Sequence, residues 1–259
     1  MLENLRIILI EPSGPANIGA VCRAMFNMGL SDLHIVSPRC ELDTPESRGY
    51  ATHAQHILQR ANVVADIPAA LTDCISSFVT SAKLGLYRRQ VAETPRAAAM
   101  DAVRRARAGK VALAFGREDR GILTDELLHF DRVITIPANP DYPVMNLAAA
   151  VMLVCYELRL AASEAVGQPE LPTALNETPA DEGRKTALFE QLFAAFDDVD
   201  VFRGQNPTHL RYILRQIFGR ANMTAMESDV MIGVARQIRY YVQQRGGPLR
   251  VDPSAETRE

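Results

Sequence analysis

The stretch that decides the fold reads Leu5-Arg6-Ile7-Ile8-Leu9-Ile10-Glu11-Pro12-Ser13-Gly14-Pro15-Ala16-Asn17-Ile18-Gly19-Ala20-Val21-Cys22-Arg23. An apolar run ends in a loop rich in proline and glycine and continues with helical spacing, which predicts a strand that turns into a helix. Arg23 would lie within the first two turns of that helix. In an open α/β sheet such a loop lies beyond the carboxyl end of its strand, where ligands bind.

Outward from this stretch, the first 160 residues alternate short β-branched runs with helical patterns, which is typical of a parallel sheet with crossover helices. The expected strands are Leu5–Ile10, Leu33–Val36, Val63–Ala65, Ser77–Thr80, Val111–Phe115 and Val133–Ile136. The expected helices are Ile18–Met28, Glu46–Gln59, Arg96–Arg107 and Leu147–Ala162. The last helix is apolar on nearly every face, so we expect it to be buried in the core or against another subunit.

The remaining chain predicts a separate helical unit. Residues 163–183 lose periodicity and combine prolines and glycines with five acidic and no basic side chains, which indicates a linker. Beyond it we expect three helices, Lys185–Phe196, Thr208–Phe218 and Thr224–Gln244. The sequence thus predicts a first domain over 1–162, a linker over 163–183, a helical domain over 184–246 and a disordered tail over 247–259.

Charge distribution and cysteine spacing indicate which kinds of partner and metal site to expect. The net charge is −3, but residues 184–250 hold ten basic and six acidic side chains, so the positive excess lies in the helical domain. The four cysteines are widely spaced and form no zinc-binding pattern, so we expect reduced thiols and no metal. No apolar run approaches the roughly 20 residues of a membrane span, and we expect a soluble cytoplasmic protein.

Two further loops after expected strands are unusual. Phe115-Gly116-Arg117-Glu118-Asp119-Arg120-Gly121-Ile122 places a glycine on each side of four charged residues, and glycines permit close backbone approach to a ligand. Ile136-Pro137-Ala138-Asn139-Pro140-Asp141-Tyr142-Pro143-Val144-Met145-Asn146-Leu147 contains three prolines, which hold a loop rigid. Asn146 is placed to cap the helix that begins at Leu147.

Several enzyme classes lack their fingerprints in this chain. Gly14 and Gly19 have the spacing of a phosphate-binding P-loop, but Ala20 and Val21 replace its Lys-Ser/Thr pair, which disfavours a nucleotide triphosphatase. The chain has no G-x-G-x-x-G and no G-x-S-x-G, which disfavours nicotinamide or flavin Rossmann enzymes and α/β-hydrolases.

Taken in order, N-x-G-x-x-x-R near the start, F-G-x-E-x-x-G in the middle and I-P-x-N followed by N-L resemble the motifs of SPOUT (TrmH/SpoU-like) RNA 2′-O-methyltransferases. The opening Arg6–Ile10, the Thr80-Ser81-Ala82 strand end and the helical C-terminal region resemble TrmJ-type tRNA (cytidine/uridine-2′-O-)-methyltransferases. The resemblance covers nearly the whole chain.

This resemblance implies an α/β fold with a parallel sheet and a deep C-terminal trefoil knot, followed by a small all-α RNA-binding domain. It also implies S-adenosyl-L-methionine as cofactor and a homodimer that pairs through the first and last helices of the knotted domain. The implied reaction is methylation of a ribose 2′-hydroxyl in RNA, at a pyrimidine that opens the tRNA anticodon loop.

The motif positions imply roles for individual residues. Arg23 and Asn146 match catalytic positions. The cofactor pocket would be lined by Thr80, Ser81, Ala82, Gly116, Gly121, Ile136, Val144 and Met145. Substrate contacts would come from Asn17, Lys83, Arg88, Arg117 and Glu118. Arginines of the C-terminal helices, namely Arg211, Arg215, Arg220, Arg236 and Arg239, would extend the basic surface along an RNA.

One departure from the pattern keeps other functions open. The family usually reads Ser-Leu-Asn where this chain has Val144-Met145-Asn146, so a hydroxyl is missing. A catalytically inactive SPOUT module that only binds RNA is therefore an alternative, as is the same chemistry on ribosomal RNA or another tRNA site. A Rossmann-like small-molecule enzyme is a third, supported only by the α/β pattern.

Overall fold

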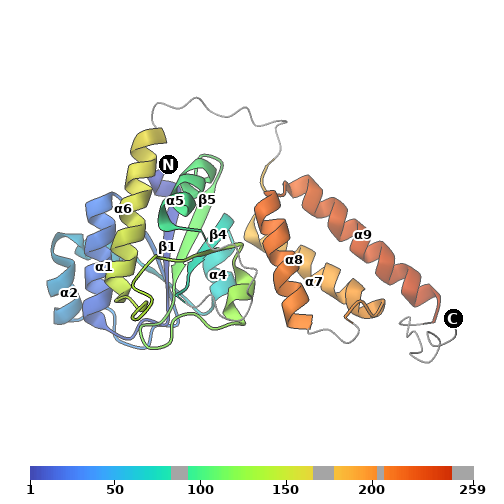
Figure 1. Ribbon diagram of the computed structural model, residues 1–259, viewed down its shortest axis with the longest axis horizontal. Helices are drawn as coiled ribbons and strands as arrows, with labels where there is room; N and C mark the ends of the chain where they lie inside the picture. Colours follow the sequence, from blue (N-terminus) through green and yellow to red (C-terminus); the bar gives the residue numbers. More distant parts are fainter. Residues whose placement is uncertain (83–92, 166–177, 203–206, 247–259) are drawn as a thin grey trace.

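The computed structural model describes residues 1–82, 93–165, 178–202 and 207–246 (Figure 1). Its centre is a six-stranded sheet in the order β3-β2-β1-β5-β4-β6. Every pairing between these strands is parallel. The strands are β1 (Leu5–Ile10), β2 (Asp32–Val36), β3 (Asn62–Val64), β4 (Cys74–Thr80), β5 (Lys110–Phe115) and β6 (Arg132–Ile134).

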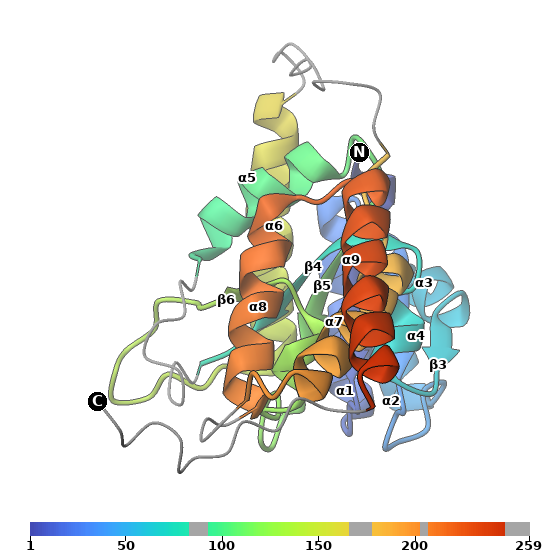
Figure 2. The same cartoon turned by 90° about the vertical axis from the view of Figure 1, so that its right-hand side faces the viewer.

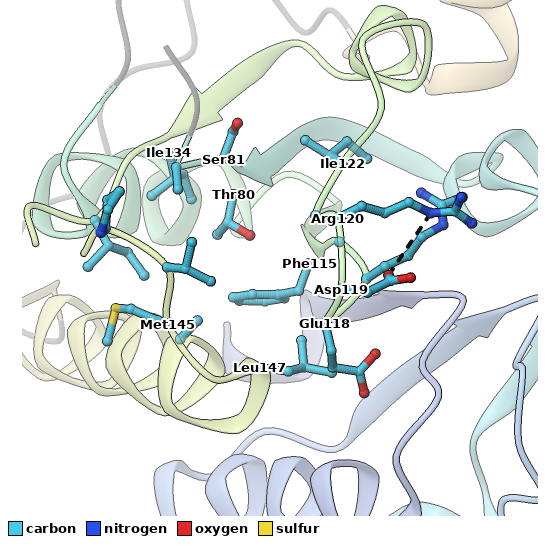
Figure 3. A pocket seen from close by; sticks show the side chains of 18 residues that line it. Thr80, Ser81, Phe115, Glu118, Asp119, Arg120, Ile122, Ile134, Met145 and Leu147 are labelled. Carbon is cyan, nitrogen blue, oxygen red and sulfur yellow. Dashed lines mark ion pairs between the residues drawn. The ribbon is translucent and has the colours of Figure 1, made fainter. Parts of the chain in front are cut away.

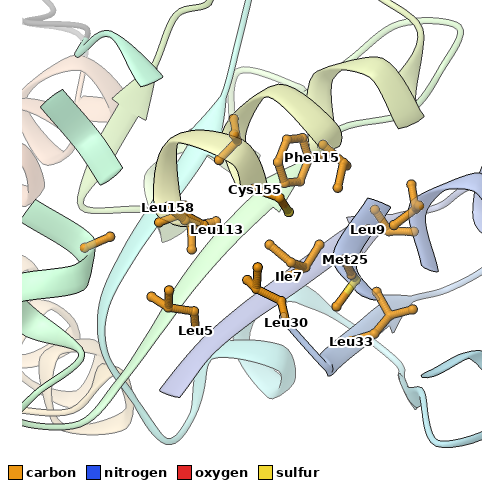
Figure 4. Packing of buried hydrophobic residues seen from close by; sticks show 14 of the residues in the cluster. Leu5, Ile7, Leu9, Met25, Leu30, Leu33, Leu113, Phe115, Cys155 and Leu158 are labelled. Carbon is orange, nitrogen blue, oxygen red and sulfur yellow. The ribbon is translucent and has the colours of Figure 1, made fainter. Parts of the chain in front are cut away.

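One face of the sheet is covered by α1 (Pro15–Met28), α5 (Pro95–Arg105) and α6 (Leu147–Ala165). Alternate residues of β1, namely Leu5, Ile7 and Leu9, point into this layer and pack with Met25 of α1 and Leu158 of α6 (Figure 4). All six residues of β1 are buried, as expected for a central strand with both faces covered. The first six residues of the quoted sequence thus form a central strand of the sheet.

The opposite face carries a second apolar layer. Ile8 and Ile10 of β1 pack there with α4 (Ile67–Leu71) and the 3-10 helix η3 (Glu126–His129). Tyr212, which belongs to α8 (Pro207–Ala221), is buried in the same cluster. The C-terminal helices therefore share a hydrophobic core with the sheet.

The described residues after 180 form three helices: α7 (Glu182–Asp198), α8 and α9 (Ala225–Gln244) (Figure 2). A buried charge cluster, consisting of Asp131, Glu182, Lys185 and Arg215, joins α7 and α8 to the start of β6. The Lys185 ammonium donates to Asp131 Oδ2 at 2.9 Å, to Glu182 Oε1 at 2.9 Å and to the Ile75 carbonyl at 2.8 Å. Gly219 of α8 lies against Asp131, so closely that a Cβ there would be 2.8 Å from the Asp131 Cβ.

The expected helix Glu46–Gln59 is wrong as a single element. The chain forms α2 (Pro45–Ala51), a 3-10 turn (Thr52–Ala54) and α3 (Gln55–Gln59) instead. The break lies at Thr52, whose φ of +50° is incompatible with a right-handed helix. The expectation also missed α4 and η3, and it placed the end of β6 at Ile136 although the strand ends at Ile134.

The ends of the expected linker are helical. Residues 163–165 continue α6, and α7 begins at Glu182, where Asp181 caps the helix by accepting from the Arg184 amide at 2.7 Å. The cap places Glu182 and Lys185 on the face that meets the sheet. The middle of the expected linker and the expected tail, 247–259, lie outside the described residues.

Candidate functional site

A cavity of about 360 Å³ lies at the carboxyl ends of β4, β5 and β6 (Figure 3). Three segments far apart in the sequence line it: Thr80 to Ala82, Phe115 to Ile122, and Ile134 to Ala150. This volume falls within the range of roughly 300–1,000 Å³ that is usual for small-molecule sites. The cavity therefore brings together two of the three loops that the sequence singled out, those after β5 and β6, with the Thr80-Ser81-Ala82 strand end.

The eight residues expected at the cofactor all line this cavity. They are Thr80, Ser81, Ala82, Gly116, Gly121, Ile136, Val144 and Met145. Of the expected substrate residues, Glu118 and Arg117 lie at the same wall, and Asn17 lies behind Glu118. Lys83 and Arg88 lie outside the described residues.

Two glycines shape the wall that follows β5. The loop closes on itself, since the Arg117 amide donates to the Gly121 carbonyl at 3.0 Å and the Gly121 amide donates back at 2.9 Å. A Cβ on Gly116 would lie 2.5 Å from the Ile122 nitrogen, and Gly121 has a φ of +68°. Both positions thus require glycine, one for space and one for its backbone conformation.

The segment after β4 is held on both sides. The Thr80 hydroxyl donates to the Ala114 carbonyl at 3.2 Å, which ties it to β5. The Ser81 amide donates to the Ile134 carbonyl at 2.9 Å, and the Thr135 hydroxyl donates to the Ser81 carbonyl at 3.1 Å. These bonds keep the backbone of this segment in a fixed place at the cavity mouth.

A polar network joins the three motif loops. The Glu118 carboxylate accepts from the amides of Ser13 and Gly14, at 3.1 and 3.2 Å, and from the Asn17 side chain at 3.3 Å. Asn17 Oδ1 in turn accepts from the Asn146 side-chain amide at 2.8 Å. Asn146 also caps α6, because its Oδ1 accepts from the Ala148 amide at 2.9 Å. Glu118 and Asn17 therefore position the first loop and Asn146 relative to each other.

Arg117 does not fit the expected contact with RNA. Its side chain is only 3 % exposed, and its guanidinium forms ion pairs with Glu11 and Glu126. The hydrogen bonds from Arg117 lower the pKa of Glu11, and both glutamates raise the pKa of Arg117 despite its burial. Arg117 thus has a structural role: its ion pairs link the ends of β1 and β5 to η3.

Arg23 lies on the exposed side of α1, and it is not among the described residues that line the cavity of its own chain. Asn146 is also outside the lining and acts on it through Asn17 and α6. The single chain therefore collects the expected cofactor residues in one place and leaves the expected catalytic arginine outside it.

Eight lining residues were not expected to belong to the site, although six of them lie in the quoted loops. They are Phe115, Asp119, Arg120, Ile122, Ile134, Pro143, Leu147 and Ala150. Most of them adjoin motif residues, so their position in the chain was the available signal. Glu11 and Glu126 were likewise not expected at the site, because they lie outside the motifs. Only the structure shows them as the partners of Arg117.

The model of the SpoU rRNA Methylase family matches residues 4–156, which span the sheet and most of α6. The chain belongs to the SpoU rRNA methylase family. A relative from Photorhabdus laumondii, a tRNA (cytidine/uridine-2'-O-)-methyltransferase TrmJ, is 33 % identical over 247 residues, which cover 94 % of this chain and all of the relative. A tRNA (cytidine/uridine/adenosine-2'-O-)-methyltransferase TrmJ from Pseudomonas aeruginosa is 32 % identical over 90 % of this chain and 93 % of its own length.

A solved structure of a TrmJ protein is also similar to this chain. The crystal structure of TrmJ from Z. mobilis matches with a TM-score of 0.73 and 30 % sequence identity, over 90 % of this chain and 98 % of that one. The similarity to family members thus extends beyond the sheet into the C-terminal helices, and the chain is an RNA methyltransferase by family.

In the described part of the chain, no group of three or more His, Cys, Asp or Glu side chains is placed to hold a metal ion. Burial raises the pKa of the Cys22 and Cys155 thiols to about 12, which makes both poor nucleophiles at neutral pH. None of the helices described by the structure has the length and apolar character needed to cross a bilayer.

Proposed function

We propose that this protein transfers a methyl group from S-adenosyl-L-methionine to the ribose 2′-hydroxyl of a pyrimidine at the start of the tRNA anticodon loop. The observation that carries this proposal is a cavity lined by the second and third motif loops of an RNA methyltransferase family, with the first motif loop hydrogen-bonded to Glu118 of its wall. The choice of tRNA rests on the TrmJ relatives, whose names specify cytidine and uridine. A tRNA substrate implies action in the cytoplasm.

The cavity fits this cofactor in size and chemistry. Its walls are mostly apolar, with Phe115, Ile134 and Leu147 able to pack on an adenine ring. Backbone groups beside Gly116 and Gly121 come close to the cavity because these residues have no side chain there. When bound, the cofactor supplies a methyl group on a positively charged sulfur.

The protein's own part in the reaction is to position and to stabilise charge. We assign Arg23 to the RNA: a guanidinium is a planar cation that can bind a phosphate with two hydrogen bonds and stabilise negative charge on the attacking oxygen. Positioning of the 2′-oxygen in line with the methyl group would then supply much of the rate. The hydroxyl proton would pass to water or to the adjacent phosphate, because an arginine stays protonated at neutral pH. Asn17, Glu118 and Asn146 hold the loops around this point.

A second copy of the chain would complete the site. Arg23 lies outside the cavity of its own chain, and Phe26 of α1 and Tyr156 of α6 are about half exposed on neighbouring helices. Exposed aromatic side chains of this kind are typical of contact surfaces. We propose that α1 and α6 form the homodimer contact.

We also propose that the segment from Ile136 to Leu147 completes a trefoil knot. This segment lines the same cavity as the loops after β4 and β5 before it continues into α6. We also treat α7–α9 as a small all-α RNA-binding domain.

The missing family serine favours one other function, an inactive module that binds RNA. Val144 stands in its place, and both Val144 and the following Met145 are exposed at the cavity. We favour activity, because backbone contacts and an apolar surface at these positions still suit the cofactor.

The test is methyl transfer to RNA. Purified protein is incubated with labelled S-adenosyl-L-methionine and total tRNA, and the RNA is digested to nucleosides. We expect 2′-O-methylpyrimidines from the wild type and from a control with exposed Arg60 replaced by alanine, and none from Arg23→Ala. Binding of tRNA without any transfer by the wild type would instead identify the inactive module.

A further inference from the structure

The outward face of the last three turns of α9 carries a group of side chains that the cavity does not use. Six exposed residues at helical spacing make up this group, which we call the α9 patch: Arg236, Gln237, Tyr240, Tyr241, Gln244 and Arg245. Residues 237, 240, 241 and 244 are spaced i, i+3, i+4 and i+7, so they lie on one face. Helix α9 is at the outer edge of the molecule in Figure 1 and faces the viewer in Figure 2.

The arginines of this patch differ from most others on the C-terminal helices. Arg215 pairs with Glu182, Arg211 with Asp197 and Arg239 with Asp198. Among the described residues, no carboxylate pairs with Arg236 or Arg245. The sequence has no acidic residue between Asp229 and Asp252, although the chain as a whole is acidic. Arg220 of α8 is likewise exposed and has no carboxylate partner among the described residues. The charges of Arg236 and Arg245 are therefore available to an external partner, and these two arginines lie next to exposed aromatic rings.

The aromatic residues complete the pattern. Tyr240 and Tyr241 are each 56 % exposed. The Arg245 guanidinium lies over the Tyr241 ring, 4.7 Å from its centroid, and donates to the Tyr241 hydroxyl at 3.1 Å. One face of that ring is therefore covered by a cation. Gln237 and Gln244 lie one turn before and one turn after the two tyrosines, and their side-chain amides can donate and accept hydrogen bonds.

We propose that the α9 patch is a platform on which unpaired nucleotides of the RNA substrate stack. Tyrosine rings accept any base by stacking, arginines neutralise the adjacent phosphates, and glutamines can bond to base edges. Tyrosine and arginine also occur at protein interfaces. RNA is favoured here because the patch carries positive charge and no acidic residue, which suits a phosphate backbone. The inference deepens the proposed function, because it rests on RNA as the partner and names where the helical domain holds it.

The test compares RNA affinity in variants of the full-length protein at one salt concentration. The probes are a labelled, unstructured 12-nucleotide RNA, a duplex of the same length and a tRNA transcript. We expect Tyr240→Leu and Tyr241→Leu each to weaken binding of the single strand and the tRNA by about tenfold. Tyr241→Phe should keep the affinity, because it keeps the ring. Arg245→Gln should lower the slope of log affinity against log salt by about 1.

Met226→Gln is the matched control, since Met226 is an exposed apolar residue in the first turn of the same helix. It should leave RNA affinity unchanged. Unchanged RNA affinity in both tyrosine variants would overturn the proposal. A changed mass in sedimentation with unchanged RNA affinity would also overturn it, and would assign this face to contact with a second copy.

The two proposals fail separately. If the wild type transfers no methyl group but binds single-stranded RNA through the tyrosines, the platform stands and the enzymatic proposal fails. If methyl transfer proceeds and the tyrosine variants show wild-type affinity and KM for tRNA, the platform fails alone. Affinity for S-adenosyl-L-methionine should not change in any of these variants.

Discussion

Replacing Lys185 with methionine would remove one of the two cations in the buried charge cluster. The Asp131 and Glu182 side chains are 1 % and 3 % exposed, so the two carboxylates would face each other with only Arg215 between them. Methionine has a similar length and fills the same space. The effect therefore reports charge and hydrogen bonding more than lost volume.

The magnitude follows from burial. Breaking a buried ion pair by removing one partner costs about 3–5 kcal/mol, because an uncompensated charge remains in the interior. Three hydrogen bonds from the ammonium are lost at once, one of them to the Ile75 carbonyl. We expect the free energy of unfolding to fall by that amount at pH 7.

The assay is urea unfolding followed by circular dichroism, with Arg184→Met as the control. Arg184 also pairs with a carboxylate, Asp229, but both are exposed, so its loss should cost about 0.2–1 kcal/mol. A Lys185→Met deficit no larger than that of the control would refute the reasoning. The double variant Lys185→Met/Glu182→Gln should recover part of the stability, because it also removes the surplus negative charge.

The deficit should depend on pH in a defined direction. Burial and the charge of Asp131 raise the pKa of Glu182, whereas Lys185 and Arg215 outweigh burial and hold the pKa of Asp131 at about 2. A raised pKa in the folded state means that the folded protein binds a proton more readily than the unfolded chain. The Lys185→Met variant should therefore regain stability as pH falls from 7 to 5, relative to the wild type.

Three other perturbations follow from the same structure. Gly116→Ala should weaken S-adenosyl-L-methionine binding at least tenfold by calorimetry, because its Cβ displaces the backbone at Ile122; unchanged affinity would remove this loop from the site. Arg6 lowers the pKa of Asp73, so Asp73 stabilises the fold above its unfolded pKa of about 4 and loses this effect as pH falls below it. Urea midpoints should accordingly drop less between pH 6 and pH 3 in Asp73→Asn than in the wild type. The Cys155 thiol should react with a maleimide only after unfolding, and fast labelling of the native protein would contradict its burial.

The sequence by itself determined the elements that local patterning controls. The apolar run from Leu5 to Ile10 and the loops after the strands identified a parallel sheet with its cavity at the carboxyl ends. The motif order identified ten of the eighteen residues that line this cavity. These features are local, because hydrophobic period and glycine or proline positions act within a few residues of the chain.

Only the tertiary structure decided which charged side chains are available. Arg117 and Arg23 are both arginines of motif segments, yet one is paired with Glu11 and Glu126 while the other is exposed. The same holds on the C-terminal helices, where Arg215 forms a buried ion pair with Glu182 and Arg245 lies over the exposed Tyr241 ring. The physical reason is that a charge is neutralised by a partner within a few ångströms, and folding brings that partner from more than 100 residues away in the case of Glu11.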